Sequence, residues 1–489
     1  MIKTPKSIAI VGGGTAGFVA ALILKKRFPE LKIDIVRSTK IGIIGVGEGS
    51  TEHWKEFMEF LGISPSTIIR ECDATYKCGI MFQNWGVPDY LHSIQTEMHV
   101  KLGQYPYVYA KLIGDNSPSQ ALSTRHFWNN RVNKWFLSNT AENPTNQFHF
   151  NTNKLNSFLT SLASSAGITV YDDEIENFDI DEDGNITTLH GAKKKYNYDF
   201  YIDSTGFKKL LISKLGAKWQ SYSKYLKMNS AIAFPTGDTE NYNMWTIARG
   251  MDAGWLFRIP VWGRHGNGYI FNSDYMDVDG AKAEVEKLYG YEIEIGKHIT
   301  FDPGALDRVW INNCCAIGLS ASFVEPLEAS SIGSSIQQSF LLMHRIINYN
   351  QQVIDSYNAD CNDILTNIRD FVALHYVTKR NDTDFWKSLK DVPLPDSLAE
   401  KIELWRNRMP IEEDFNKISK YAMFKDPHHM FIMHGLGLFD TASIKAEFES
   451  QNIVKKLEAE AIIRSEILRD DTVSTYSHKE TLQIIRNNG

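Results

Sequence analysis

The spacing of apolar residues predicts a strand, a tight turn and a helix near the start of the chain. Residues 8–11 are all apolar and lead into Gly12-x-Gly14-x-x-Gly17, after which the residues favour a helix. In this pattern Gly12 permits the turn, Gly14 lets phosphates approach the backbone, and Gly17 lets helix and strand pack closely. Free N–H groups and the helix dipole then favour an anion. The segment therefore predicts a nucleotide-binding turn.

A second strand is predicted at residues 32–36. A dinucleotide fold usually places an acidic residue just after this strand, where it holds the ribose hydroxyls. This chain has Arg37 there. Three interpretations stay open for Arg37: contact with a phosphate, stacking on an adenine, or a solvated surface position.

The pattern turns β-rich between residues 165 and 207. Asp183-Gly184 lies between two strand-like runs and predicts a hairpin. Asp179-x-Asp181-x-Asp183 also resembles the start of a calcium loop, but the twelfth position is His190 instead of the required glutamate. We therefore predict a hairpin and no calcium site.

A helical pattern follows in the last third of the chain. From about residue 334 the apolar residues recur at spacings of three and four, which predicts a helix; they are Ile336, Phe340, Met343 and Ile347. Pro393 and Pro395 interrupt this region, and residues 441–488 are charged and favour helix. Before it, an apolar strand at 201–206 ends in Asp203-x-x-Gly206, a position from which an aspartate can reach a bound nucleotide.

Composition limits the class of protein. With 489 residues, 43% hydrophobic and 23% charged, the chain fits a soluble globular protein. The net charge of −7 argues against general nucleic-acid binding. Five cysteines without a CxxC pair indicate a reducing cytoplasm, with no disulfide framework and no zinc site. Residues 7–24 carry no charge, but their glycines and the missing cleavage pattern argue against a membrane anchor.

Two further segments carry candidate chemistry. The glycine-rich run 42–50 predicts backbone packed against a flat ligand. In residues 75–82 the larger apolar side chains alternate with Lys77 and small neighbours, which predicts a strand. From this pattern alone, a solvated lysine is the default interpretation of Lys77.

Residues 323–334 combine two carboxylates with a predicted helix start. Ser330 and Ser331 suit an N-cap, where free N–H groups bind an anion. Glu325 and Glu328 would repel that anion unless they point elsewhere. Either glutamate suits a general base, and the alternative is ordinary capping with solvated acids.

Together, these motifs resemble the flavin-dependent halogenases of the tryptophan-halogenase type over most of the chain. The segments that carry the resemblance are Gly12-x-Gly14-x-x-Gly17, Gly45-Val-Gly47-Glu48-Gly49-Ser50, Thr75-Tyr-Lys77 with Phe82-x-Asn84-Trp85, Asp203-Ser-Thr-Gly206-Phe207, Trp255-Leu-Phe257-Arg-Ile259-Pro260, Gly318 to Glu328, Phe371-x-x-x-His375-Tyr376 and Arg380-x-Asp382-x-x-Phe385-Trp386. In the family's Trp-x-Trp-x-Ile-Pro motif, this chain has Phe257 as the second aromatic residue. After the last glutamate it has Ala329-Ser330-Ser331 where the family often has Ser-Thr-Gly.

The resemblance implies an α/β fold: an FAD-binding Rossmann-like (GxGxxG) fold of the flavin monooxygenase type, with an added, mostly helical C-terminal region. It places the FAD-binding and halide/catalytic domain at 1–345, with inserted β-rich substrate-facing segments, and a mainly helical substrate-side region at 346–489. It implies Lys77 and Glu328 as catalytic residues, Ser330 and Ser331 as halide-binding residues, and no metal. The implied cofactor-binding residues are Gly12, Gly14, Thr15, Ala16, Gly17, Arg37, Gly47, Glu48, Ser50, Asp203 and Gly318, and those near the flavin are Trp255, Phe257, Ile259 and Pro260.

The resemblance also implies a reaction. A separate flavin reductase supplies reduced FAD, oxygen gives a flavin hydroperoxide, and halide attacks it to form hypohalous acid. Lys77 either hydrogen-bonds the hypohalous acid or forms a haloamine, and Glu328 assists the arenium ion and its deprotonation. The expected substrate is an electron-rich aromatic of the indole or phenol type, free or carrier-bound. We expect no nucleic-acid or membrane partner, a cytoplasmic location and a homo-oligomer as one option.

Two alternatives stay open on the sequence alone. A flavin-dependent monooxygenase on the same fold is favoured by Phe257 and Arg37, and it would insert oxygen instead of a halogen. A non-catalytic flavin-binding protein is disfavoured by the presence of both Lys77 and Glu328.

Overall fold

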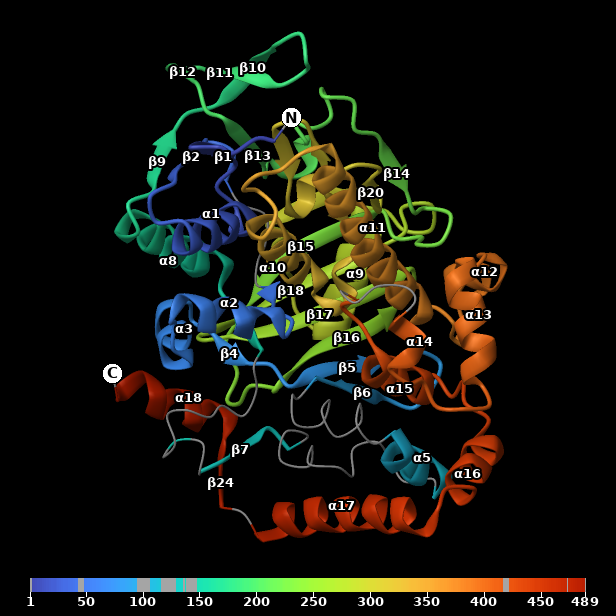
Figure 1. Cartoon of the computed structure of the whole chain (residues 1–489). Helices are drawn as coiled ribbons and strands as arrows, with labels where there is room; N and C mark the ends of the chain where they lie inside the picture. Colours follow the sequence, from blue (N-terminus) through green and yellow to red (C-terminus); the bar gives the residue numbers. More distant parts are fainter. Residues whose placement is uncertain are drawn as a thin grey trace.

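The predicted strand, turn and helix at the start of the chain are confirmed. The computed structural model describes residues 2–42, 48–94, 106–115, 129–134, 137, 147–416, 422–472 and 474–488. In it, β1 (Ser7–Val11) is central to a six-stranded sheet of order β21-β22-β13-β1-β2-β9, and α1 (Thr15–Arg27) follows the glycine turn (Figure 1). The pairs are parallel except β21 with β22. The other strands are β2 (Lys32–Arg37), β9 (Thr169–Asp172), β13 (Phe200–Asp203), β21 (Trp310–Ile311) and β22 (Cys314–Ala316).

The apolar run of β1 is buried on both faces, as expected for a central parallel strand. Helix α1 ends in Lys25, Lys26 and Arg27, whose charges suit the negative end of the helix dipole. Helices α8 (Thr152–Ser165) and α10 (Ser330–Met343) both lie against α1.

A second, seven-stranded sheet crosses the middle of the molecule (Figure 1). Its order is β19-β15-β18-β17-β16-β5-β6, and its pairs are antiparallel except β16 with β5. The strands are β5 (Gly79–Gln83), β6 (Tyr90–Ser93), β15 (Ser230–Thr236), β16 (Trp245–Met251), β17 (Gly254–Val261), β18 (Arg264–Phe271) and β19 (Lys297–Thr300).

Smaller sheets of two or three strands accompany the two large sheets. The predicted hairpin is confirmed, because β10 pairs antiparallel with β11 around Asp183-Gly184. One sheet, β3-β8-β4, brings residues 48–49 and 75–76 to either side of β8. The strands are β3 (Glu48–Gly49), β4 (Thr75–Tyr76), β7 (Arg131–Asn133), β8 (Phe148–Phe150), β10 (Ile175–Ile180), β11 (Ile186–Gly191), β12 (Lys195–Tyr196), β14 (Trp219–Ser221), β20 (Gly304–Leu306), β23 (Ser322–Phe323) and β24 (Thr475–Ser477).

The prediction of one continuous strand through residues 75–82 is wrong. Strand β4 ends at Tyr76 and β5 begins at Gly79. Between them the chain changes partners, because the Lys77 amide donates to the Gln147 carbonyl and the Cys78 amide donates to the Met244 carbonyl. Lys77 therefore lies in a break between two sheets.

The helical prediction for the last third is confirmed, with one exception. Pro393 and Pro395 separate η5 (Leu389–Asp391) from α13 (Asp396–Trp405). The exception is β24, which interrupts the helical tail and pairs with β7. The remaining helices are α2 (His53–Leu61), α3 (Pro65–Glu71), α5 (Pro106–Gly114), α9 (Val278–Tyr289), α11 (Gln351–Leu374), α12 (Asp384–Ser388), α14 (Glu413–Asn416), α15 (Asp426–Gly435), α16 (Thr441–Glu449), α17 (Ile453–Thr472) and α18 (His478–Asn487), with short η2 (Gly206–Lys208), η3 (Gly318–Ser320) and η4 (Pro326–Glu328).

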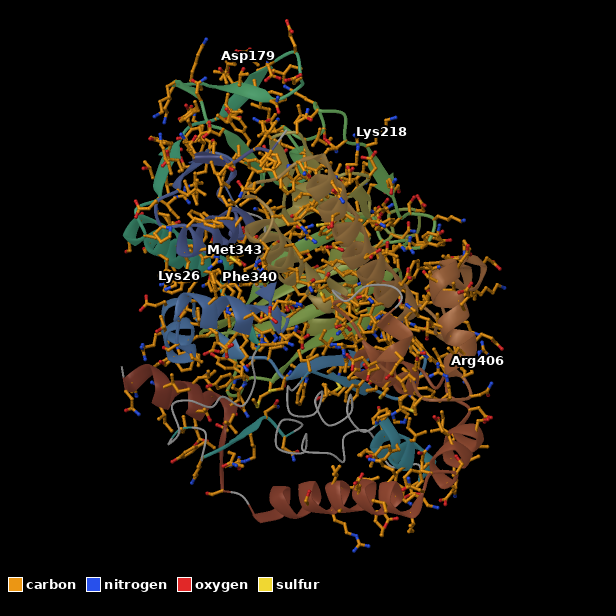
Figure 2. The ribbon with its side chains drawn as sticks, in the orientation of Figure 1. Lys26, Asp179, Lys218, Phe340, Met343 and Arg406 are labelled. Atoms are coloured by element: carbon orange, nitrogen blue, oxygen red, sulfur yellow. The ribbon has the colours of Figure 1, made fainter. Side chains whose placement is uncertain are left out.

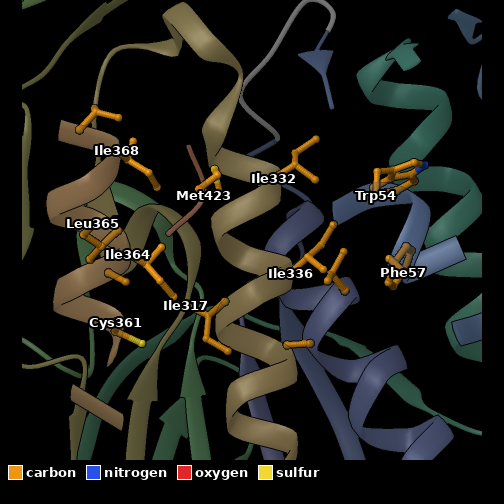
Figure 3. Close-up of a cluster of buried hydrophobic side chains, with 14 of the residues drawn as sticks. Trp54, Phe57, Ile317, Ile332, Ile336, Cys361, Ile364, Leu365, Ile368 and Met423 are labelled. Carbon is orange, nitrogen blue, oxygen red and sulfur yellow. The ribbon is translucent and has the colours of Figure 1, made fainter. Parts of the chain in front are cut away.

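Helix α10 lies in the middle of the largest hydrophobic core. Figure 3 shows Ile332 and Ile336 of α10 between side chains of α2, such as Trp54, and side chains of α11, such as Ile364. Met343 of α10 is also buried, as its helical spacing predicts (Figure 2). The core is continuous across residue 345, and the division of the chain there stays a prediction.

The charged side chains labelled in Figure 2, such as Lys26, Asp179 and Arg406, lie on the outside of the molecule. Over the part of the chain that the structure describes, no helix combines the length and the apolar character that a bilayer crossing requires.

Candidate active site

The glycine turn before α1 leaves open space beside Gly14. Gly12 has φ +118°, and a Cβ there would overlap the Ser204 carbonyl oxygen, so the turn is tightly packed on its inner side. A Cβ on Gly14 would meet no described atom within 4 Å. Within the described residues, the first turn of α1 has no side-chain cap and no acidic residue. The amides that begin this helix, including those of Thr15 and Ala16, are therefore suited to bind an anion.

Two predicted cofactor residues, Asp203 and Gly318, lie in segments that pack against the glycine turn and α1. The Asp203 carboxylate is fully buried and accepts hydrogen bonds from the Thr205, Leu211 and Ile212 amides at 2.8–3.0 Å. Asp203 therefore fixes the loop after β13 beside the glycine turn. Gly318 has φ +68°, and a Cβ there would lie 2.6 Å from the Ala16 Cβ. A glycine at this position lets the chain after β22 approach α1.

Arg37 lies at the edge of the glycine turn. Its Nη1 donates to Asn156 Oδ1 at 3.3 Å and to Thr160 Oγ1 at 3.4 Å, both on α8. Its aliphatic stem covers Gly13, where a Cβ would overlap it. Because the side chain is half-buried against the turn, the position is not a freely solvated one. Contact of Arg37 with a phosphate or an adenine stays a prediction.

The second glycine-rich segment is described only in part. Gly47 lies outside the described residues, whereas Glu48 begins β3. Burial raises the pKa of Glu48 to about 7. Ser50 is fully buried, and its hydroxyl accepts a hydrogen bond from the Phe148 amide at 2.9 Å. These contacts fix the end of the segment beside β8.

Lys77 is buried, so the default interpretation of a solvated lysine is wrong. Its side chain is 1% exposed, and Nζ donates to the Ser50 carbonyl at 2.8 Å. Burial lowers the pKa of Lys77 to about 8, and the negative charge of Glu328 opposes part of this effect. At neutral pH the protein therefore holds a lysine that loses its proton easily.

Two histidines hold the Glu328 side chain. His375 Nε2 lies 2.8 Å from Oε1, and His92 Nδ1 lies 3.0 Å from both carboxylate oxygens. Burial alone would raise the pKa of Glu328, but His92 and His375 outweigh it and hold the pKa at about 2. The sequence reasoning assigned no role to either histidine, although His375 belongs to one of the quoted motifs.

Lys77 and Glu328 face one cavity. The cavity has an empty volume of about 270 Å³, part of it open to solvent, between the start of α2, the segment before β5, and α15. Its lining is Thr51, Glu52, His53, Lys77, Ile94, Gln147, Glu328, Met423, Phe424 and His428. A cationic hydrogen-bond donor and a carboxylate therefore line the same cavity, and because both side chains are buried, their electrostatic effects are stronger than in water.

Glu325 is a second buried carboxyl with different neighbours. Its Oε2 accepts hydrogen bonds from Trp255 Nε1 at 2.7 Å and from the Tyr376 hydroxyl. Burial raises the pKa of Glu325 to about 7. The ring of Phe257 lies 6.2 Å from that of Trp255 and covers Gly268, where a Cβ would overlap it.

Strand β17, which carries residues predicted to lie near the flavin, also contacts the strand before Lys77. Ile259 and Pro260 lie on β17, and the Pro260 carbonyl accepts a hydrogen bond from Thr75 Oγ1 at 2.7 Å. Thr75 lies on β4, directly before Lys77. Strand β17 therefore links the aromatic motif to the position of Lys77.

The prediction that Ser330 or Ser331 caps α10 is wrong. The helix begins at Ser330, and its N-cap is Ala329 in the left-handed conformation at φ +53°, with no side-chain cap among the described residues. The left-handed residue turns the chain directly after Glu328. Ser330 and Ser331 line a second cavity of about 310 Å³, together with Gly318, Ser322 and other residues. Neither Glu325 nor Glu328 lines this cavity, so neither carboxyl group faces the anion position predicted there.

The family follows from comparison with known proteins. The family model described as tryptophan halogenase matches residues 7–447. The chain belongs to the tryptophan halogenase family. It is therefore an enzyme of the oxidoreductase class, on the α/β fold of the flavin-dependent halogenases.

Individual relatives support this assignment over almost the whole chain. The 7-chloro-L-tryptophan 6-halogenase KtzR of Kutzneria sp. is 31% identical, and the alignment covers 96% of this chain and 98% of the relative. The solved structure of Xcc4156, a flavin-dependent halogenase from Xanthomonas campestris, is 28% identical with a TM-score of 0.81, and 99% of each chain is covered. A tryptophan halogenase structure from Shewanella frigidimarina has a TM-score of 0.90 at 24% identity, covering 99% and 98%, and supports the fold.

Among the described residues, no group of three or more histidine, cysteine, aspartate or glutamate side chains is arranged to hold a metal ion.

Proposed function

We propose that this enzyme halogenates an electron-rich aromatic substrate of the indole or phenol type, with reduced FAD, oxygen and a halide ion. The observation that carries the proposal is the meeting of Lys77 and Glu328, two buried groups of opposite charge, in one cavity. The family of the chain supports the same chemistry.

The described residues fit FAD and halide. The gap at Gly14 and the amides that begin α1 suit the pyrophosphate of FAD. When bound, reduced FAD would activate oxygen, and the activated oxygen would be the oxidant that converts halide to hypohalous acid. The cavity lined by Ser330 and Ser331 at the start of α10 suits the halide, because helix amides bind anions.

Lys77 acts on the hypohalous acid, and Glu328 acts on the positively charged ring of the substrate. As an ammonium, Lys77 donates a hydrogen bond that polarises hypohalous acid; as a free amine, it is a nucleophile that forms a haloamine. Its pKa of about 8 makes both forms accessible. The Glu328 carboxylate stabilises the positive charge of the arenium ion and accepts its proton. Burial keeps the oxidant from water.

The proposal includes a separate flavin reductase as partner and a substrate that is free or carrier-bound. A cytoplasmic location fits the five buried cysteine thiols. Assembly into a homo-oligomer is compatible with this account.

Paired variants test the roles of the two residues. We expect Lys77→Met and Glu328→Gln to lower halogenated product by about 100-fold or more, which is the usual effect of losing a positioned acid, base or charge. Flavin binding should persist, because Lys77 contacts the predicted cofactor residue Ser50 at its backbone carbonyl, which the substitution leaves in place. Lys401→Met is the matched control, since Lys401 is also a buried lysine but lies on α13. Halogenation that survives in Lys77→Met would reject the assigned role.

A further inference from the structure

Glu325 and Glu328 are two buried carboxyl groups with different hydrogen-bond donors. Both are buried at the same turn before α10, at 0% and 2% exposure. Glu325 is held by an indole and a phenol, whereas Glu328 is held by two imidazoles. The pKa of Glu325 is about 7 and that of Glu328 is about 2. The histidines therefore account for the difference between the two carboxyl groups.

The backbone fixes where the proton of His375 lies. His375 Nδ1 is 2.8 Å from the Phe371 carbonyl oxygen, and a carbonyl only accepts, so Nδ1 carries a hydrogen. The opposite nitrogen, Nε2, is 2.8 Å from Glu328 Oε1. A proton must lie between these two atoms, because two lone pairs would repel at this distance. His375 is then an imidazolium beside a carboxylate, or a neutral ring beside a carboxylic acid.

His92 continues the chain of contacts on the other side. Its Nδ1 lies equally close to both Glu328 oxygens, which is the geometry of an N–H donating to a carboxylate. Its Nε2 lies 3.0 Å from His428 Nδ1. One hydrogen must lie between Nε2 and His428 Nδ1, because two lone pairs would repel at this distance. An N–H of His92 that donates to both oxygens favours the charged carboxylate over the acid.

We propose that His375 and His92 are positioning residues that hold Glu328 as a charged carboxylate facing the cavity, with the compensating proton on His375. The proposal deepens the proposed function and rests on it for its catalytic meaning. Oε1 accepts from both histidines, whereas among the described residues Oε2 accepts only from His92. Oε2 is therefore the oxygen with a lone pair left for the substrate.

The charge balance of the step follows from this arrangement. When the arenium C–H bond breaks, its electron pair returns to the ring and its proton forms an O–H bond at Glu328 Oε2. His375 keeps its own proton throughout. The carboxyl group then passes the proton to water when the product leaves, and the resting carboxylate is restored.

Other groups also face Glu328 and enter its titration. Lys77 and Tyr90 interact electrostatically with it, and Lys77 favours the charged form. Glu52, His53 and His428 line the same cavity. None of these is changed in the variants below, so their contributions are shared by the wild-type and variant proteins.

Infrared difference spectroscopy of the resting holoenzyme tests the proposal without turnover. The carboxylic-acid C=O band that Glu328→Gln removes reports the protonation of Glu328. In the wild type we expect no such band at pH 5–8. In His375→Gln the apparent pKa of this band should rise by about 1 to 3 units, the usual effect of losing an adjacent positive charge. In the double variant His92→Gln/His375→Gln, the pKa of Glu328 should lie near the pKa of Glu325, at about 7.

His429→Gln is the matched control, because His429 is a buried histidine on α15 that bonds to the Lys425 carbonyl. It should leave the Glu328 band unchanged. If His375→Gln does not fold, His92→Gln provides the same readout from the other side. A Glu328 acid band in the wild type at pH 7, or a double variant that stays ionised at pH 5, would overturn the proposal.

The pH dependence of kcat/KM gives the functional readout. In His375→Gln the acid limb of the profile should move to higher pH, by the same amount as the rise in the apparent pKa that the infrared titration measures. A structural role alone would lower kcat/KM without moving the limb, and this result would overturn the positioning role. A wild type that shows the expected infrared behaviour but makes no halogenated product would reject the proposed function and leave the charge arrangement supported.

Discussion

Replacing Lys77 by methionine should make the protein more stable while it abolishes activity. The pKa of Lys77 is about 8, against 10.5 for an ordinary lysine, because burial penalises the ammonium. At about 1.36 kcal/mol per pH unit, holding the charged form costs the native state about 3 kcal/mol. Removing it leaves the Ser50 carbonyl without this donor, which costs about 1 kcal/mol. We expect Lys77→Met to raise the free energy of unfolding by about 2 kcal/mol at pH 7.

The pH dependence gives this prediction a distinctive sign. The native state binds the proton of Lys77 less tightly than the unfolded chain does, so the cost is complete below pH 8. Between pH 8 and 10.5 the native protein has released the proton and the unfolded chain still holds it, so the cost fades. The stability advantage of Lys77→Met should therefore shrink as the pH rises through this window.

Urea denaturation followed by tryptophan fluorescence, at pH 7 and at pH 10, measures both quantities. The difference between wild type and Lys77→Met is taken at each pH, so that other titrating groups largely cancel. A variant that is less stable than the wild type at pH 7 would refute the reasoning. An advantage that does not shrink at pH 10 would refute it as well.

Three further predictions follow from the same geometry. If Lys77 acts as an ammonium, kcat should fall as the pH rises through about 8, and if it forms a haloamine, kcat should rise there; a flat profile would exclude both roles. Gly12→Ala should abolish FAD retention on gel filtration, because its Cβ would overlap the Ser204 carbonyl; Gly167→Ala, at positive φ with open space around it, should retain FAD, and equal retention would contradict the packing argument. We propose that Ala329-Ser330-Ser331, in place of the family's Ser-Thr-Gly, widens the halide pocket, so bromide should compete well against chloride in a mixed-halide assay; a clear chloride preference would reject this proposal.

Local pattern was sufficient for much of the fold. The strand, glycine turn and α1 are encoded within about twenty residues of the chain, so their spacing could be interpreted directly. The hairpin at Asp183-Gly184 and the helices after residue 330 are local in the same way. Strand β24 was missed, because its partner β7 lies far away in the sequence and the surrounding tail favours helix.

The histidines around Glu328 could not be predicted, because they meet only in the folded chain. His92 is 236 residues from Glu328 and 336 from His428. No periodicity connects such positions. The burial of Lys77 could not be predicted either, because it depends on a break between two sheets whose strands are far apart in the sequence. The start of α10 was misplaced because a left-handed alanine, Ala329, carries no signal in the sequence.

The most direct test of the central claim is aerobic turnover of indoles and phenols with FAD, a flavin reductase and NADH. Chloride, bromide and iodide are supplied separately, products are identified by mass spectrometry, and Lys77→Ala is run alongside the wild type. The account predicts a halogenated product that requires halide and is lost in Lys77→Ala. A hydroxylated product would indicate a monooxygenase, and halogenation unchanged in Lys77→Ala would show that free hypohalous acid acts without the lysine. Either result would contradict the account.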